Sequence, residues 1–166
     1  MIKVEARSKS KSKCSRCGAG SKSLGEGVEF IINCLRHRKS VWESISRIVP
    51  DNLEVWSWFV YRIAQYIDHL VFKLGVKLGN KDKAYEKLAE VFEKVIAPEI
   101  ERIEGSLRGL PITIYLASGD MYDEIHVCVD LVERIDKQRF EEYRNIVKKL
   151  GLKYTGTANC KQLYKV

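Results

Sequence analysis

Four side chains near the N-terminus have the types and the spacing of zinc ligands. Cys14 and Cys17 form a C-x2-C pair, and Cys34 and His37 form a C-x2-H pair after 16 intervening residues. A two-residue spacing lets both members of a pair reach one ion from a tight turn or from one turn of helix. Three thiolates and one imidazole fill a tetrahedral shell, and closed shells of this kind are structural. The sequence therefore predicts a structural Zn²⁺.

The segments around these ligands resemble known zinc modules. Residues 14–18, C-S-R-C-G, resemble the first knuckle of zinc-ribbon and treble-clef fingers, and residues 34–37, C-L-R-H, are similar to their second ligand pair. The resemblance covers about residues 12–49 and implies a small recognition module stapled by Zn²⁺, with a returning strand at residues 28–32. The apolar residues of that strand also fit a helical stripe, so a core helix with Cys34 as a buried thiol is the alternative.

Basic residues concentrate in the same part of the chain. Residues 1–25 contain seven Lys or Arg and one Glu, a net +6 out of a formal +7 for the whole protein. Residues 1–13 are expected to form a flexible tail that attracts polyanions by counterion release. A Lys/Ser tail that only improves solubility is the competing interpretation. The tail and the zinc module supply the predicted phosphate contacts, namely Lys3, Arg7, Lys9, Lys11, Lys13, Arg16, Lys22, Arg36 and Arg38.

Hydropathy and cysteine content suggest the compartment. No apolar run reaches the roughly 18 residues of a spanning helix, and the charged N-terminus lacks the apolar core of a signal peptide. We therefore expect a cytoplasmic, intracellular protein with no membrane partner. Five cysteines, an odd number, argue against a secreted disulfide framework, so Cys128 and Cys160 are expected to be buried free thiols, with their pairing as the alternative. The many Lys and Glu with three Gln are typical of thermophilic proteins.

The remaining chain divides into a helical region and a region of mixed period. Apolar residues at helical spacing predict helices over residues 41–49, 53–74 and 85–105, with a break at residues 75–82 and a kink at Pro98. Alternating residues then predict strands at 112–116 and 125–131, a helix between Asp136 and Leu150, and strands at 152–154 and 160–166.

These elements predict an α+β protein with a C-terminal β-β-α-β-β unit. The apolar face of its sheet should meet the helix, and the other face should be open to solvent. The expected division of the chain is a basic tail at 1–13, a zinc module running into the first helix at 14–49, a helical region at 51–106 and the C-terminal unit at 110–166.

One strand carries the residues of a possible catalytic site. Glu124, His126, Cys128 and Asp130 alternate along residues 124–130 and point to the same side. Carboxylates with a histidine could hold a divalent metal for phosphodiester cleavage. A solvated strand face normally carries such residues without any catalysis, however.

The leading functional interpretation is non-catalytic binding of nucleic acid, DNA or RNA, as a regulator or as an accessory subunit of a processing machine. The alternative is a protein-interaction scaffold or a small subunit of a larger assembly, with the tail docking an acidic partner. A metal-dependent nuclease is the third interpretation, and no phosphate-cradling glycine loop or nucleophile motif supports it.

Overall fold

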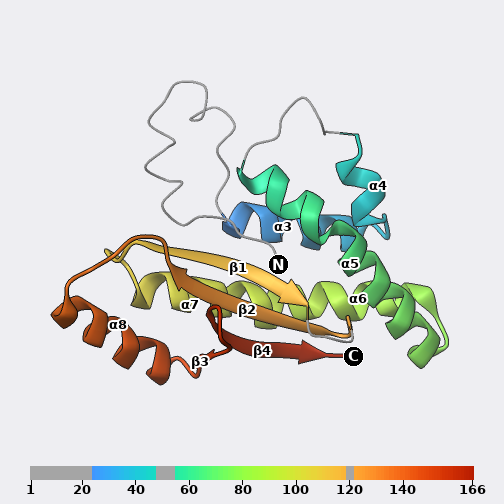
Figure 1. The fold of residues 1–166 in the computed structure, drawn as a ribbon. Coiled ribbons are helices and arrows are strands. Elements are labelled where there is room, and N and C mark those ends of the chain that lie inside the picture. Colours follow the sequence, from blue (N-terminus) through green and yellow to red (C-terminus); the bar gives the residue numbers. More distant parts are fainter. Residues whose placement is uncertain (1–23, 48–54, 119–121) are drawn as a thin grey trace.

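Helices precede a small antiparallel sheet in this protein (Figure 1). The computed structural model describes residues 24–47, 55–118 and 122–166, with the backbone alone for residues 55–62. The helices are α3 (Leu24–Arg36), α4 (Val41–Ile45), α5 (Val55–Leu78), α6 (Lys81–Val91), the π-helical turn η1 (Phe92–Ile96), α7 (Ala97–Ser106) and α8 (Lys137–Lys149). The strands are β1 (Ile112–Ser118), β2 (Glu124–Leu131), β3 (Lys153–Tyr154) and β4 (Asn159–Lys165). The predicted α+β class is confirmed.

The apolar run at residues 28–32 is helical and not a strand. α3 buries Val28, Ile31 and Leu35, which recur at the three- and four-residue spacing of one helix face. Glu29 falls on the opposite face and is exposed. The returning strand expected from the resemblance to zinc modules is therefore wrong, and the alternative of a core helix is confirmed.

The start of α4 is fixed by two side chains. Ser40 is its N-cap, as the sequence predicts, and the Ser40 hydroxyl accepts a hydrogen bond from the Glu43 amide at 3.2 Å. Asp68 of α5 accepts hydrogen bonds from the amides of Val41 at 3.0 Å and Trp42 at 3.2 Å. Because a helix leaves its first amides without partners, this carboxylate joins α4 to α5.

α5 continues to Leu78, so the break predicted from residue 75 begins too early. Gly75 lies where α5 and α6 approach closely. A Cβ at this position would be in van der Waals contact with the Cα of Lys81 at 3.4 Å, and the glycine does not end the helix. The chain turns at Gly79, whose φ is 72°, and the side chain of Asn80 then caps α6.

α6, η1 and α7 follow one another without an intervening loop. Pro98 lies in the first turn of α7 and has no amide hydrogen to donate to the preceding turn. The π-helical turn η1 stands directly before it, which is where the sequence predicts a kink. The helix is therefore adjusted at Pro98 and continues to Ser106.

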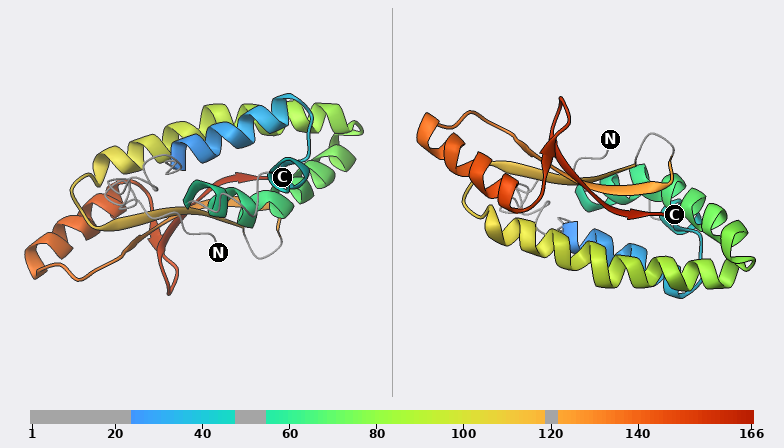
Figure 2. Two further views of the ribbon diagram at one scale, coloured as in Figure 1. Left: turned by 90° about the horizontal axis from the view of Figure 1, so that it is seen from above. Right: turned by 90° about the horizontal axis from the view of Figure 1, so that it is seen from below.

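The C-terminal unit has the predicted β-β-α-β-β order, and its strands form an antiparallel sheet in the order β1-β2-β4-β3. The register places Leu116 opposite Val127 and Cys128 opposite Cys160. Figure 2 shows α3, α6 and α7 together on one side of this sheet. The apolar residues of β1 and β2 that face them are buried, among them Ile114, Leu116, Val127 and Val129.

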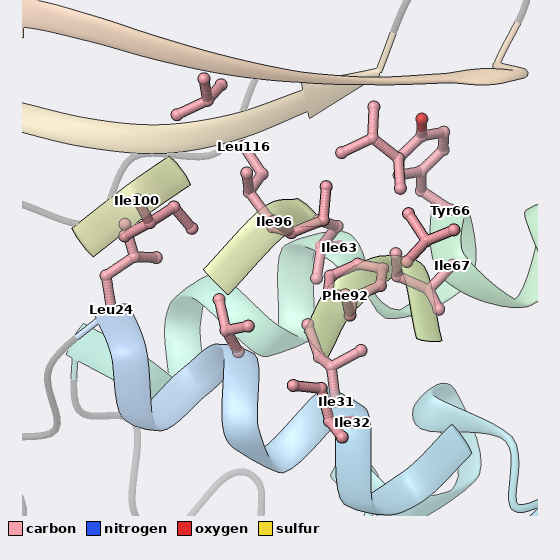
Figure 3. Packing of buried hydrophobic residues seen from close by; sticks show 14 of the residues in the cluster. Leu24, Ile31, Ile32, Ile63, Tyr66, Ile67, Phe92, Ile96, Ile100 and Leu116 are labelled. Atoms are coloured by element: carbon pink, nitrogen blue, oxygen red, sulfur yellow. The ribbon is translucent and has the colours of Figure 1, made fainter. Parts of the chain in front are cut away.

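One hydrophobic core joins the helical and the C-terminal regions in the described residues. Figure 3 shows Phe92 between Ile31 of α3 and Ile67 of α5, with Leu116 of β1 approaching from the sheet. α8 contributes Tyr143 and Val147 to the same core, whereas Phe140 remains partly exposed. The described residues of the segments predicted at 14–49, 51–106 and 110–166 therefore share one core.

The other face of the sheet has a smaller buried cluster of its own, formed by Tyr115, Cys128, Ala158 and Cys160. Cys128 and Cys160 are joined by a disulfide. The expectation of two free thiols is therefore wrong and the alternative of pairing is correct. The expectation of a solvent-open face is also wrong at the centre of the sheet, because these side chains are excluded from water.

Candidate nucleic-acid interface

The second pair of predicted zinc ligands lies at the C-terminal end of α3. Cys34 belongs to the buried core, and its thiol is hydrogen-bonded to Ser44 of α4. Burial raises the pKa of the Cys34 thiol, and the bond with Ser44 opposes this shift. His37 is exposed, and its Nδ1 lies 2.7 Å from the backbone carbonyl oxygen of Asn33.

The structure gives these two residues different surroundings. Cys34 faces α4 and the core, whereas His37 faces solvent. A zinc-bound cysteine is a thiolate, and the apolar surroundings of Cys34 favour the neutral thiol. Cys34 is a core residue of the described structure, Cys14 and Cys17 lie outside the described residues, and the four-ligand zinc site stays a prediction.

Two of the predicted phosphate contacts are engaged by carboxylates. Arg36 forms an ion pair with Glu93 of η1, and Arg38 pairs with Asp82 and Glu86 of α6. These pairs attach the end of α3 to the neighbouring helices. Exposed ion pairs contribute only about 0.2–1 kcal/mol each, so a phosphate could replace these carboxylates at small cost. The contacts expected from Lys3 through Lys22 lie outside the described residues.

The polar face of β2 carries a Glu–His pair. The Nε2 atom of His126 lies 2.6 Å from a carboxylate oxygen of Glu124, and Lys165 approaches the same carboxylate at 3.7 Å. Cys128 is held in its disulfide, and the carboxylate of Asp130 accepts a hydrogen bond from the Leu131 amide. Within the described ranges, no group of three or more His, Cys, Asp or Glu is placed to hold a metal ion. The metal-nuclease interpretation thus finds no assembled site on this face.

A second concentration of basic residues lies at the C-terminal end of the chain, and the sequence reasoning missed it. Residues 131–166 contain nine Lys or Arg and four Asp or Glu, a net +5, whereas residues 26–130 contain 13 and 17, a net −4. The net charge of all residues after the first 25 is +1, and this single value conceals the difference between the two segments. A separate charge count for each predicted unit would have revealed it.

Three of these lysines follow one another within six residues and are exposed. Lys148 and Lys149 occupy the last turn of α8, and Lys153 follows on β3. Among the described residues, no carboxylate forms an ion pair with any of them. Lys161 differs, because its ammonium lies 3.3 Å from the carboxylate of Glu99 on α7.

The β3–β4 hairpin presents an exposed aromatic ring at the residue that follows Lys153. Tyr154 is 68% exposed, and its hydroxyl donates a hydrogen bond to the carbonyl oxygen of Gly156 at 2.9 Å. The turn is closed by the Thr155 amide, which donates to the Ala158 carbonyl at 2.8 Å, and Gly156 has a φ of 99°. Figure 2 shows the hairpin projecting from the sheet on the side away from α3, α6 and α7.

No helix in the described part of the chain is both long and apolar enough to cross a membrane. Comparisons of the chain with protein-family models, with curated proteins and with solved structures found no significant match.

Proposed function

We propose that this protein binds nucleic acid, DNA or RNA, without catalysing a reaction on it, as a regulator or as an accessory subunit of a processing machine. The observation that carries the proposal is the net +6 within residues 1–25, out of +7 for the chain. Lysines that neutralise phosphates release condensed counterions, which favours binding at low salt without any base recognition. The half-exposed Arg36 and Arg38 would extend these contacts by exchanging their carboxylate partners for phosphates.

A binding titration at several salt concentrations tests this proposal. The informative variant replaces Lys9, Lys11 and Lys13 by Gln, and its matched control replaces three exposed lysines of α5 and α6, Lys77, Lys83 and Lys87, by Gln. Both variants have the same net charge, so a difference between them depends on position. We expect the first to weaken binding and to flatten the slope of log K against log salt by about 2, at roughly 0.7–0.9 for each phosphate that is no longer neutralised. Absence of binding to DNA and RNA by the unmutated chain at low salt would overturn the proposal.

A structural Zn²⁺ held by Cys14, Cys17, Cys34 and His37 is a separate part of the proposal. It would give the N-terminal region a defined shape and would position Arg16, Lys22, Arg36 and Arg38 for phosphate contacts, whereas the tail at residues 1–13 binds phosphates without it. Metal content tests it: about one Zn²⁺ per chain is expected, and Cys14→Ser should abolish it. Cys34→Ala then shows whether Cys34 turns towards the metal. Retention of Zn²⁺ by that variant would assign Cys34 to the core alone, as its burial suggests.

The exposed apolar residues of α5 favour a second candidate function, a protein-interaction scaffold. Phe72 and Val76 lie one helical turn apart and are 65% and 70% exposed. Residues of this kind on one helix face suit contact with a protein partner. A chain that binds neither DNA nor RNA, and whose assembly with a protein partner is abolished by Phe72→Ser, would be a scaffold and not a nucleic-acid-binding protein.

A further inference from the structure

We infer that the end of α8 and the β3–β4 hairpin form a second nucleic-acid contact surface, one that prefers single strands. This surface, named here the hairpin surface, consists of Lys148, Lys149, Lys153 and Tyr154. The inference rests on the proposed function and names a site that the N-terminal charge does not supply.

Charge is the first argument for the hairpin surface. Lys148, Lys149 and Lys153 are exposed, they follow one another within six residues, and no carboxylate of the described residues pairs with them. The preceding part of the chain, residues 26–130, carries a net −4. This acidic excess lies in residues 112–130, which contain four Asp or Glu and no Lys or Arg, whereas residues 26–111 contain 13 of each kind. A polyanion is therefore attracted to the C-terminal lysines and not to the neutral helical layer.

Tyr154 is the second argument, and it selects a single strand. The ring of Tyr154 is 68% exposed, so it is open to an approaching base. The bond from its hydroxyl to the Gly156 carbonyl holds the ring against its own turn. A ring that is fixed before binding loses little conformational entropy when a base stacks on it. Unpaired bases offer their faces to such a ring, whereas the bases of a duplex are already stacked on each other.

The stability of α8 explains only part of this surface. Lysines in the last turn complement the helix dipole, which would account for Lys148 and Lys149. The C-terminal carbonyl of Leu150, however, already accepts hydrogen bonds from Arg102 and Lys161, each at 3.4 Å. Lys153 and Tyr154 lie beyond the helix, so the dipole accounts for neither of them.

The position of the hairpin favours access by an extended ligand. It projects from the sheet on the side opposite α3, α6 and α7, and α8 ends beside its base (Figures 1 and 2). β3 is an edge strand that pairs with β4 alone, so its outer side has no neighbouring strand in the sheet. Lys153 and Tyr154 are consecutive on β3 and point to opposite sides of this edge. A strand of nucleic acid that follows the edge can therefore contact the lysines and place one base on Tyr154.

The first experiment measures binding of the full chain to a labelled oligothymidylate of about 16 nucleotides and to a duplex of the same length. The hairpin-surface variant replaces Lys148, Lys149 and Lys153 by Gln. The variant with Lys77, Lys83 and Lys87 replaced by Gln is again the control, because it has the same net charge. We expect the hairpin-surface variant alone to lower the salt slope for oligothymidylate, by about 2 at roughly 0.7 for each phosphate that is no longer neutralised.

The second experiment separates stacking from the shape of the hairpin. Tyr154→Ala should weaken binding of oligothymidylate by about 5- to 100-fold. Tyr154→Phe keeps the ring, removes the bond to Gly156 and should bind within about threefold of the unmutated chain. Tyr122→Ala, at another exposed tyrosine, is the control and should leave binding unchanged. Circular dichroism of each variant verifies that the fold is retained.

The possible results distinguish this inference from the proposed function. Lack of binding by the unmutated chain overturns both. Binding that falls when Lys9, Lys11 and Lys13 are replaced, but is unaffected by the hairpin-surface variant and by Tyr154→Ala, overturns the hairpin surface and leaves the proposed function standing. Tighter binding of the duplex, with no effect of Tyr154→Ala, overturns the preference for single strands. Weakening by the control lysine variant to the same degree also overturns the inference, since position would then not matter.

Discussion

Cys128 and Cys160 lie directly opposite each other on β2 and β4, with their Cα atoms 4.1 Å apart, and a disulfide joins them. The bond closes a loop that contains the end of β2, all of α8 and β3. It therefore fixes β4 and the hairpin to the part of the sheet that packs on the helices.

Reducing this disulfide should destabilise the protein by about 3–4 kcal/mol, because a loop closed over a sequence separation of 32 residues restricts the unfolded chain. Urea denaturation with and without reductant measures the difference. The variant with Cys128→Ala and Cys160→Ala should be equally stable under both conditions. A thiol assay verifies that the reductant has broken the bond. If the unmutated chain is then as stable with reductant as without it, the prediction is wrong.

Asp68 should matter more for stability than an exposed carboxylate does. It accepts hydrogen bonds from the amides of Val41 and Trp42 and from the hydroxyl of Ser40. Asp68→Ala leaves these donors without a partner and should cost about 2–3 kcal/mol in the free energy of unfolding. Ser40→Ala should cost about 1 kcal/mol, and Glu133→Ala, an exposed carboxylate, about zero. A cost for Asp68→Ala no larger than that for Glu133→Ala would show that the cap does not stabilise α4.

The protein should become less stable in alkali, partly through Tyr143. Burial raises the pKa of Tyr143 to about 12, although the hydrogen bond that its hydroxyl accepts from Asn159 opposes the shift. A raised folded-state pKa gives stability that is complete below the unfolded value of about 10 and is lost as pH rises towards 12. Tyr143→Phe should flatten the fall in the free energy of unfolding over this range. If the free energy of unfolding falls as steeply with pH in Tyr143→Phe as in the unmutated chain, the prediction is wrong. Tyr122→Phe, at an exposed ring, is the control.

Glu99 should stabilise the packing of α7 against the sheet. Burial acts to raise the pKa of Glu99, but hydrogen bonds from Arg102 and Lys161 outweigh it and leave the pKa below its usual value. A lowered folded-state pKa gives stability that is present above the unfolded pKa of about 4.3 and is lost as pH falls through the folded value. Glu99→Gln should therefore cost about 1–2 kcal/mol at neutral pH and much less below pH of about 3. Glu101→Gln, at an exposed neighbour, is the control. A destabilisation that is the same at both pH values would exclude the charge as its cause.

The periodicity of the chain determined most of its secondary structure, because burial of one face imposes a period of 3.6 on a helix and of 2 on a strand. The alternation of Ile112, Ile114 and Leu116 predicted β1, and the cap at Asp136 with Gly151 after the helix end predicted α8. Residues 28–32 were ambiguous because a short apolar run satisfies both periods. Only the packing of α3 on α6 and α7 decided for the helix.

The sequence by itself determined the charge of the N-terminal 25 residues, the α+β class and the order of the C-terminal elements. Tertiary structure decided which distant residues meet. The register of β2 and β4 brought Cys128 to Cys160, the approach of α3 to α6 gave Arg38 its carboxylates, and the core enclosed Cys34. The β3–β4 hairpin left the ring of Tyr154 exposed to solvent. Such contacts join residues far apart in the chain, and local periodicity holds no information about them because it records only which face of an element is buried.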